Sequence, residues 1–208
     1  MKKTFKGILF ALMAIISINA FAQEEKSCEL YFKDFTIKAG ETKTIYLYLQ
    51  NNFLGRDFQV QVFFGEGITP VAVKARKYFV PIGRALGEGT VFSQLYDEGE
   101  RRLRMLSNNF DGESVFTPGD EPIAELKVKA DDNFSGKVIC QVKDIPGWTC
   151  KLNCDIVNPD GTKGVLSVEQ KNYRKFNAYP AVTIPWLLAN GVEGGEYGIA
   201  DPVAVVAE

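Results

Sequence analysis

Four cysteines carry the most chemically versatile side chains of this 208-residue sequence, and no histidine accompanies them. They are Cys28, Cys140, Cys150 and Cys154, and the last three follow a C-x9-C-x3-C spacing. Zinc sites combine Cys and His ligands at characteristic spacings, so a metal site is the least favoured interpretation. An even number of cysteines in an exported chain favours disulfides. We predict two disulfides with the pairing open, and one disulfide with two free thiols as the alternative.

The lack of histidine also limits the catalytic chemistry that the chain can support. A Ser-His-Asp or Cys-His nucleophile and a histidine general base are excluded. A pair of carboxylates, as in glycoside hydrolases, remains open. The candidates are Glu66, Asp97, Glu98, Glu100, Asp111, Glu113, Asp120 and Glu121. All of them fall in expected turns, where acidic side chains usually serve solvation and local hydrogen bonds. We therefore predict that the protein is not an enzyme and needs no cofactor.

The N-terminal residues have the composition of a secretory signal peptide. Three lysines in MKKTFKG precede the apolar run ILFALMAIISI, and Ala20 and Ala22 occupy the −3 and −1 positions of a cleavage site. The apolar run is too short to span a membrane. Cleavage after Ala22 would leave Gln23 first and not a cysteine, so the usual lipoprotein signal is missing. We expect an exported protein, periplasmic or secreted to the cell surface or beyond, without a membrane span.

Alternation of apolar and polar residues predicts β-strands along most of the remaining chain. In the segment Lys33–Asn52, Ile45, Leu47 and Leu49 alternate with polar residues, which is the period of a strand with one buried face. The same alternation predicts buried faces for Phe58, Val60 and Val62, for Leu103 and Met105, for Ala124, Leu126, Val128 and Ala130, and for Val138, Cys140 and Val142. About nine short strands separated by turns, with no long helix before residue 180, predict an antiparallel β-sandwich.

The chain changes character beyond Gln170, where scattered prolines and glycines lead to an apolar end. We divide the chain into a signal peptide (1–22), a β-sandwich domain (23–168) and a C-terminal extension (169–208). The extension is expected either to pack on the sandwich or to begin a second small module.

The order of several short motifs resembles that of cohesin domains. The motifs are D-F-T-I-K-A-G-E-T-K-T-I (34–45), F-Q-V-Q-V (58–62), G-I-T-P-V (67–71), I-A-E-L-K-V-K-A (123–130), F-S-G (134–136) and the strand 137–145. The resemblance implies a nine-stranded jelly-roll sandwich, with an immunoglobulin-like sandwich as the alternative. The sequence resembles the exported, stand-alone cohesin-like proteins of Gram-negative bacteria. This resemblance implies a non-catalytic recognition or adhesion module. Because a fold hosts many functions, this step is an analogy.

The resemblance also implies where a protein partner would bind. In cohesins, the partner-binding sheet contains the third, fifth and sixth strands, which correspond here to residues 58–64, 90–96 and 102–107. The outward side chains expected there are Gln59, Gln61, Phe63, Arg102 and Arg104. Aromatic and arginine side chains are typical of protein interfaces. The expected partner is a dockerin-like or other envelope protein, and the net charge of −2 gives no reason to expect nucleic acid.

A carbohydrate-binding module is the alternative function. Tyr46 and Tyr48 lie two residues apart on one strand and are expected to point outward from the opposite sheet, where they could stack on sugar rings. We favour the competing interpretation that the C-terminal segment covers them, because Trp186, Leu187 and Leu188 need burial.

The C-terminal residues YGIADPVAVVAE resemble the end of a dockerin-type calcium loop entering its helix. With Asp201 at the closing position, the first three ligand positions hold Asn190, Val192 and Gly194. Two of these three have no side-chain ligand, so we predict no metal site in this tail.

Overall fold

The computed structural model describes residues 25–86, 90–109 and 116–181. The predicted signal peptide and the dockerin-like tail, including Trp186 and Asp201, lie outside the described residues. Strands make up most of the described chain, and its only helix is a single 3-10 turn, η1 (Gly83–Ala85). No helix in the described ranges is long and apolar enough to cross a membrane.

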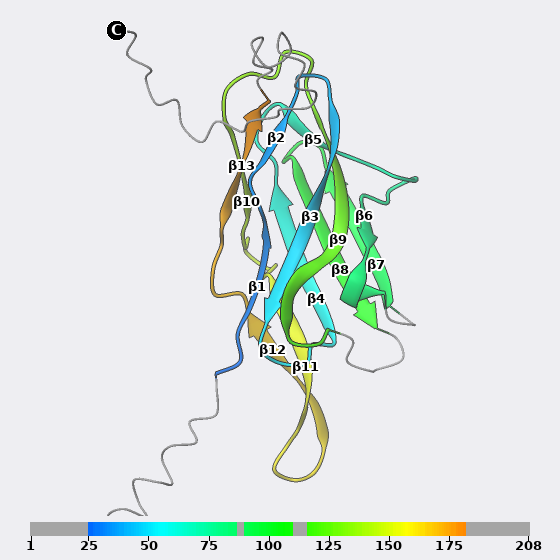
Figure 1. The fold of residues 1–208 in the computed structure, drawn as a ribbon. Helices are drawn as coiled ribbons and strands as arrows, with labels where there is room; N and C mark the ends of the chain where they lie inside the picture. The colour runs from blue at the N-terminus through cyan, green and yellow to red at the C-terminus, as the bar shows by residue number, and fades with distance from the viewer. Residues whose placement is uncertain (1–24, 87–89, 110–115, 182–208) are drawn as a thin grey trace, which may run out of the picture.

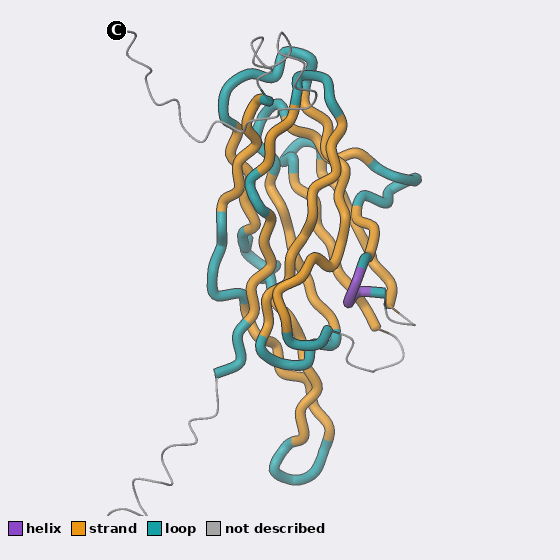
Figure 2. The backbone as a smooth tube through the Cα atoms, in the orientation of Figure 1, coloured by secondary structure: helices purple, strands orange, loops and turns teal. Residues whose placement is uncertain are grey.

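The strands form two sheets that pack face to face (Figures 1 and 2). The five-stranded sheet consists of β1 (Cys28–Phe32), β3 (Thr42–Asn51), β9 (Gly119–Ala130), β5 (Ile68–Val71) and β6 (Phe79–Pro81). The eight-stranded sheet consists of β7 (Thr90–Asp97), β8 (Arg102–Asn109), β4 (Asp57–Phe63), β10 (Val138–Val142), β11 (Lys151–Val157), β12 (Lys163–Glu169), β13 (Lys175–Pro180) and β2 (Phe35–Ile37). Every pairing is antiparallel except that of β2 with β13. The predicted all-β jelly-roll sandwich is confirmed.

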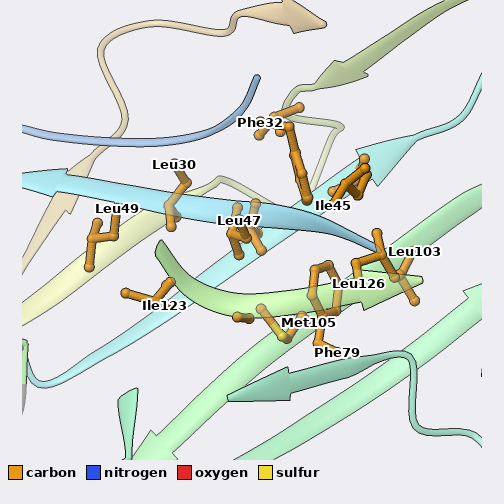
Figure 3. Packing of buried hydrophobic residues seen from close by; sticks show 14 of the residues in the cluster. Leu30, Phe32, Ile45, Leu47, Leu49, Phe79, Leu103, Met105, Ile123 and Leu126 are labelled. Carbon is orange, nitrogen blue, oxygen red and sulfur yellow. The ribbon is translucent and has the colours of Figure 1, made fainter. Parts of the chain in front are cut away.

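The core between the sheets is built from the alternating residues that the sequence predicted (Figure 3). Leu47 and Leu49 of β3 are completely buried against the same core as Phe58 and Val60 of β4. Polar neighbours on each strand point to the other side, as the two-residue period of a strand requires. This regular alternation on both sheets fixes the register of the sandwich, because a shift of one residue would expose the whole apolar set.

The sandwich contains elements that the sequence analysis did not anticipate. Residues 79–85, for which the alternation predicted no strand or helix, hold β6 and η1. The side chain of Gln94 on β7 links this segment to the other sheet: its Oε1 accepts hydrogen bonds from the backbone N–H groups of Tyr78 and Phe79. The eight-stranded sheet also continues beyond residue 168, since β13 pairs with both β10 and β2.

Replacing Phe58 by alanine should lower the free energy of unfolding by about 3–5 kcal/mol, because it removes a fully buried ring from the centre of the core. Chemical denaturation of the purified protein measures the change. Val157→Ala, at a position that is 73% exposed, is the matched control and should change the same quantity by less than about 0.5 kcal/mol. A Phe58→Ala variant as stable as the control would contradict this description of the core.

Candidate partner-binding face

The five residues predicted to contact a partner lie on one face of the eight-stranded sheet. Strand register places Arg104 of β8 opposite Gln61 of β4, and Arg102 opposite Phe63. Directly paired residues of antiparallel strands point to the same side of a sheet. Gln59 and Phe63 flank Gln61 at a spacing of two, so all five side chains leave the outer surface. The predicted strands and the outward direction of these side chains are therefore correct, but Gln61 and Arg102 are buried, while Gln59, Phe63 and Arg104 are half-buried.

A loop between β10 and β11 covers the outer side of β4. Gln61 is completely buried, and its Nε2 donates a hydrogen bond of 2.7 Å to the carbonyl oxygen of Lys143. The Nε2 of Gln59 donates to the carbonyl oxygen of Thr149, at the other end of the loop. Both glutamine amides thus hold the chain's own loop. The prediction that Gln61 contacts a partner is wrong because its side chain is buried, whereas Gln59 is half-buried.

The loop itself is a tight turn with an internal anchor. Ile145 and Trp148 exchange backbone hydrogen bonds of 2.9 and 3.2 Å across Pro146-Gly147, and Gly147 has a φ of 81°. A proline followed by a glycine with positive φ is the signature of a type II turn.

Asp144 fastens the base of this turn. It accepts hydrogen bonds from the Cys150 backbone N–H at 2.7 Å and from the Tyr173 hydroxyl at 2.6 Å. Burial and the Asp144 carboxylate together raise the pKa of Tyr173, so its hydroxyl stays protonated as the donor at neutral pH.

The two predicted arginines have different surroundings. Arg102 is buried, and its guanidinium forms ion pairs with Glu100 at 2.8 Å and Asp97 at 3.3 Å. These contacts close the β7–β8 hairpin, so the prediction that Arg102 is a free contact residue is wrong. Arg104 remains half-exposed, and its guanidinium carbon lies 5.2 Å from the centre of the Trp148 ring. Such a cation–π contact orients both side chains at the surface.

Apolar side chains that the sequence analysis missed complete this surface. On β7, Val91 and Leu95 are 48% and 54% exposed, and Leu95 lies directly opposite Arg104. Leu106 of β8 continues the same face, since it pairs with Ser93 and Gln59. We call this surface the β7–β8 face; its members are Val91, Leu95, Arg104, Leu106 and Trp148. The Pro146-Gly147 pair predicts a turn beside Trp148, and this was the available sequence signal for that residue. The alternation along β7 could have placed Leu95 on the outer face.

On the opposite sheet, the two tyrosines proposed for glycan stacking are unequal. Tyr48 stacks on Tyr31 with ring centres 5.2 Å apart, and the Lys33 ammonium lies 4.2 Å from the Tyr48 ring centre. Tyr46 is 40% exposed. One ring that is already stacked and one that is free do not make the aromatic line that a sugar-binding surface needs. The favoured covering by residues 180–208 lies largely outside the described residues.

Four of the six described carboxylates considered for hydrolysis form structural contacts. Asp97 and Glu100 pair with Arg102, Asp120 accepts the Tyr31 hydroxyl at 2.7 Å, and Glu121 pairs with Arg84 at 2.9 Å. Asp111 and Glu113 lie outside the described residues. Within the described ranges, no three acidic or cysteine side chains converge as a metal site.

The four cysteines are buried free thiols, so the predicted disulfides are not found in the structure. Cys150 and Cys154 are four residues apart at β11, about 13 Å along a strand, which is too far for a bond. Each thiol has its own neighbour: Cys28 donates to the Val168 carbonyl at 3.3 Å, and Cys140 accepts from the Gly65 N–H at 3.5 Å. They act as small core residues, which is common for buried cysteine.

A scan against protein-family models and a search of the curated proteins found no match. Solved structures of cohesins are similar in fold. The OlpC cohesin of Clostridium thermocellum, solved in complex with a dockerin, has a TM-score of 0.54 at 13% identity, over 75% of this chain and 96% of that chain. The seventh ScaB type I cohesin of Pseudobacteroides cellulosolvens has a TM-score of 0.53 at 12% identity, over 76% and 95%. A type II cohesin from the Acetivibrio cellulolyticus cellulosome has a TM-score of 0.50 at 12% identity, over 73% and 94%. The chain thus has the cohesin-like fold that its motifs suggested.

The thiols should be unreactive in the folded protein. Burial raises the pKa of Cys28 and Cys140 to about 11 and that of Cys150 to about 12, and only the thiolate attacks a thiol reagent. At pH 8 the native protein should therefore react slowly with a thiol reagent. After denaturation without reductant, four thiols per chain should react with the reagent. Fewer than four equivalents would reveal a disulfide and contradict the structure.

Proposed function

We propose that this protein is a non-catalytic recognition module that binds a protein partner through the β7–β8 face. The observation that carries the proposal is the exposure of Leu95 and Val91 beside Arg104 and Trp148 on an otherwise ordered sheet surface. Large apolar side chains exposed together around an arginine and a tryptophan are typical of interface centres.

The chemistry of the face suggests what the partner presents. The exposed apolar residues form its middle, while the Arg102 ion pairs with Asp97 and Glu100 lie at one end. A partner with an apolar ridge flanked by a carboxylate for Arg104 would satisfy both kinds of contact. Several structures of similar fold are cohesins solved with dockerins, so a dockerin-like domain is the first partner to test.

The proposal includes export. The features that support it are the three lysines, the apolar run and the alanines at positions 20 and 22. The module would then act in the periplasm or at the cell surface.

Leu95→Glu should weaken partner binding about thirtyfold or more, because it buries a charge in the middle of an apolar contact. The purified protein is immobilised, challenged with envelope and secreted extract of its host and with soluble polysaccharides, and the retained protein is titrated by calorimetry. Tyr46→Glu, at a position that is 40% exposed on the other sheet, is the control and should leave binding unchanged. Polysaccharide retention lost with Tyr46→Glu but kept with Leu95→Glu would refute the proposal and favour a carbohydrate-binding module.

Expression of the full chain in a Gram-negative host should yield an exported protein that begins at Gln23, as intact-mass measurement of the periplasmic and extracellular fractions would show. Ala22→Arg should block cleavage, because the −1 position accepts only small residues. Uncleaved wild-type protein confined to the cytoplasm would contradict the export part of the proposal and leave the binding face untouched.

A further inference from the structure

Strand β12 forms an open edge of the eight-stranded sheet. It pairs with β11 along its whole length, from Lys163 opposite Val157 to Glu169 opposite Lys151, and with no other described strand. The β11–β12 hairpin projects beyond the end of the sandwich (Figure 1). Its apolar residues are exposed there: Val157 is 73%, Val165 52% and Leu166 40% accessible.

The hydrogen-bond pattern shows which backbone groups of β12 face outward. Gln170 N–H donates to the Cys150 carbonyl at 3.0 Å, and Asn158 N–H donates to the Thr162 carbonyl at 2.8 Å. These two bonded pairs bracket the hairpin, and bonded pairs alternate with non-bonded pairs in an antiparallel ladder. The odd-numbered residues of β12 therefore direct their N–H and C=O groups away from β11; they are Lys163, Val165, Ser167 and Glu169. Within the part of the chain that the structure describes, nothing accepts or donates to those groups.

Three other edge strands of the molecule, β1, β5 and β2, are protected. Along β1, the Leu30 N–H donates to the Gln170 side chain and the Cys28 carbonyl accepts from the Lys171 N–H. Strand β5 is four residues long and contains Pro70, and β2 has three residues. Short length, proline and covering segments are the usual defences against edge-to-edge pairing. Strand β12 has seven residues, no proline and apolar side chains on both of its faces.

We propose that β12 pairs antiparallel with β12 of a second copy of this chain, with the two-fold axis at Leu166. The sequence of the strand, KGVLSVE, is self-complementary about this residue. Lys163 then lies opposite the partner's Glu169, and Val165 opposite the partner's Ser167. These are the residues whose backbone groups face outward, so every outward donor meets an outward acceptor. Leu166 falls on a non-bonded pair, where side chains approach most closely, and contacts the partner's Leu166.

The proposed pairing would stabilise two features of the β11–β12 hairpin. A projecting two-stranded ribbon is marginal in water, whereas β11–β12 joined to its copy forms a continuous four-stranded sheet. The side chains of Lys163 and Glu169 are exposed. Within one chain Lys163 lies opposite Val157 and Glu169 lies opposite Lys151, so the dimer gives Lys163 a carboxylate across the strand and adds a second cation beside Glu169. None of the residues of the β7–β8 face takes part in the register, so the inference is independent of the proposed function.

A charge-reversal cycle measured by sedimentation velocity tests the register. Lys163 and Glu169 are six residues apart on one strand, about 20 Å, so they cannot couple within a single chain at ordinary salt. Wild-type protein should dimerise. Lys163→Glu and Glu169→Lys should each weaken the dimer about tenfold, because each places like charges opposite one another at both ends of the interface. The double variant should restore the wild-type dissociation constant within about twofold.

Two further variants separate pairing from folding. Val165→Pro removes an outward N–H that makes no bond to β11, so the monomer should keep its circular dichroism and melting temperature while the dimer is lost. Leu166→Cys should form a disulfide-linked dimer on mild oxidation, and Val165→Cys, whose counterpart in the register is the partner's Ser167, should not. A wild-type protein that is monomeric at about 100 μM, or single charge reversals that the double variant fails to rescue, would overturn the proposal; capture of a different protein by this edge would do so as well.

Discussion

Strand β4 is hydrogen-bonded along both edges, and the outer surface of the eight-stranded sheet depends on how β10 and β11 share its second edge. One edge pairs with β8 along its length. On the other edge, β10 pairs with Val62 and Phe63 and β11 pairs with residues 57–59. Because two consecutive strands use the same edge in succession, the chain between them must leave the sheet and return beside Gln61. The loop 143–149 is the necessary result, and it covers the outer side of β4 at Gln61.

The loop changes the character of the face without altering the sheet. Gln61 is a polar residue at the centre of a sheet, and burying its amide is costly unless a partner accepts the N–H. The Lys143 carbonyl supplies that acceptor, and Asp144 ties the loop to Tyr173 at the far side of the turn. Trp148 is thereby held against Arg104 before any partner arrives. Holding these two side chains in place lowers the entropy that binding must overcome.

The buried half of each strand was predictable from the sequence, and the exposed half was not. Leu47, Phe58 and Leu103 face the core because alternation is a local property of the chain. Whether an outward residue is free depends on what covers it, which is a long-range property: Gln61 is covered by a loop eighty residues later, and Arg102 is enclosed by acids of its own hairpin. The cysteines show the same limit, since composition gives only their number, whereas the strand at β11 shows that Cys150 and Cys154 are too far apart to form a disulfide.

The exposed apolar side chains of the eight-stranded sheet concentrate at its two outer strands. Leu95 and Val91 lie on β7, and Val165 and Leu166 lie on β12. Folding the monomer does not require apolar residues there, and edge strands ordinarily carry charges that prevent association. On β7 the apolar residues share the outer face with Arg104, which suits a partner that lies across the sheet. On β12 they accompany a bare backbone edge, which suits a partner that extends the sheet. The outer face at β7 and the backbone edge of β12 thus differ in the geometry of the partner that each suits.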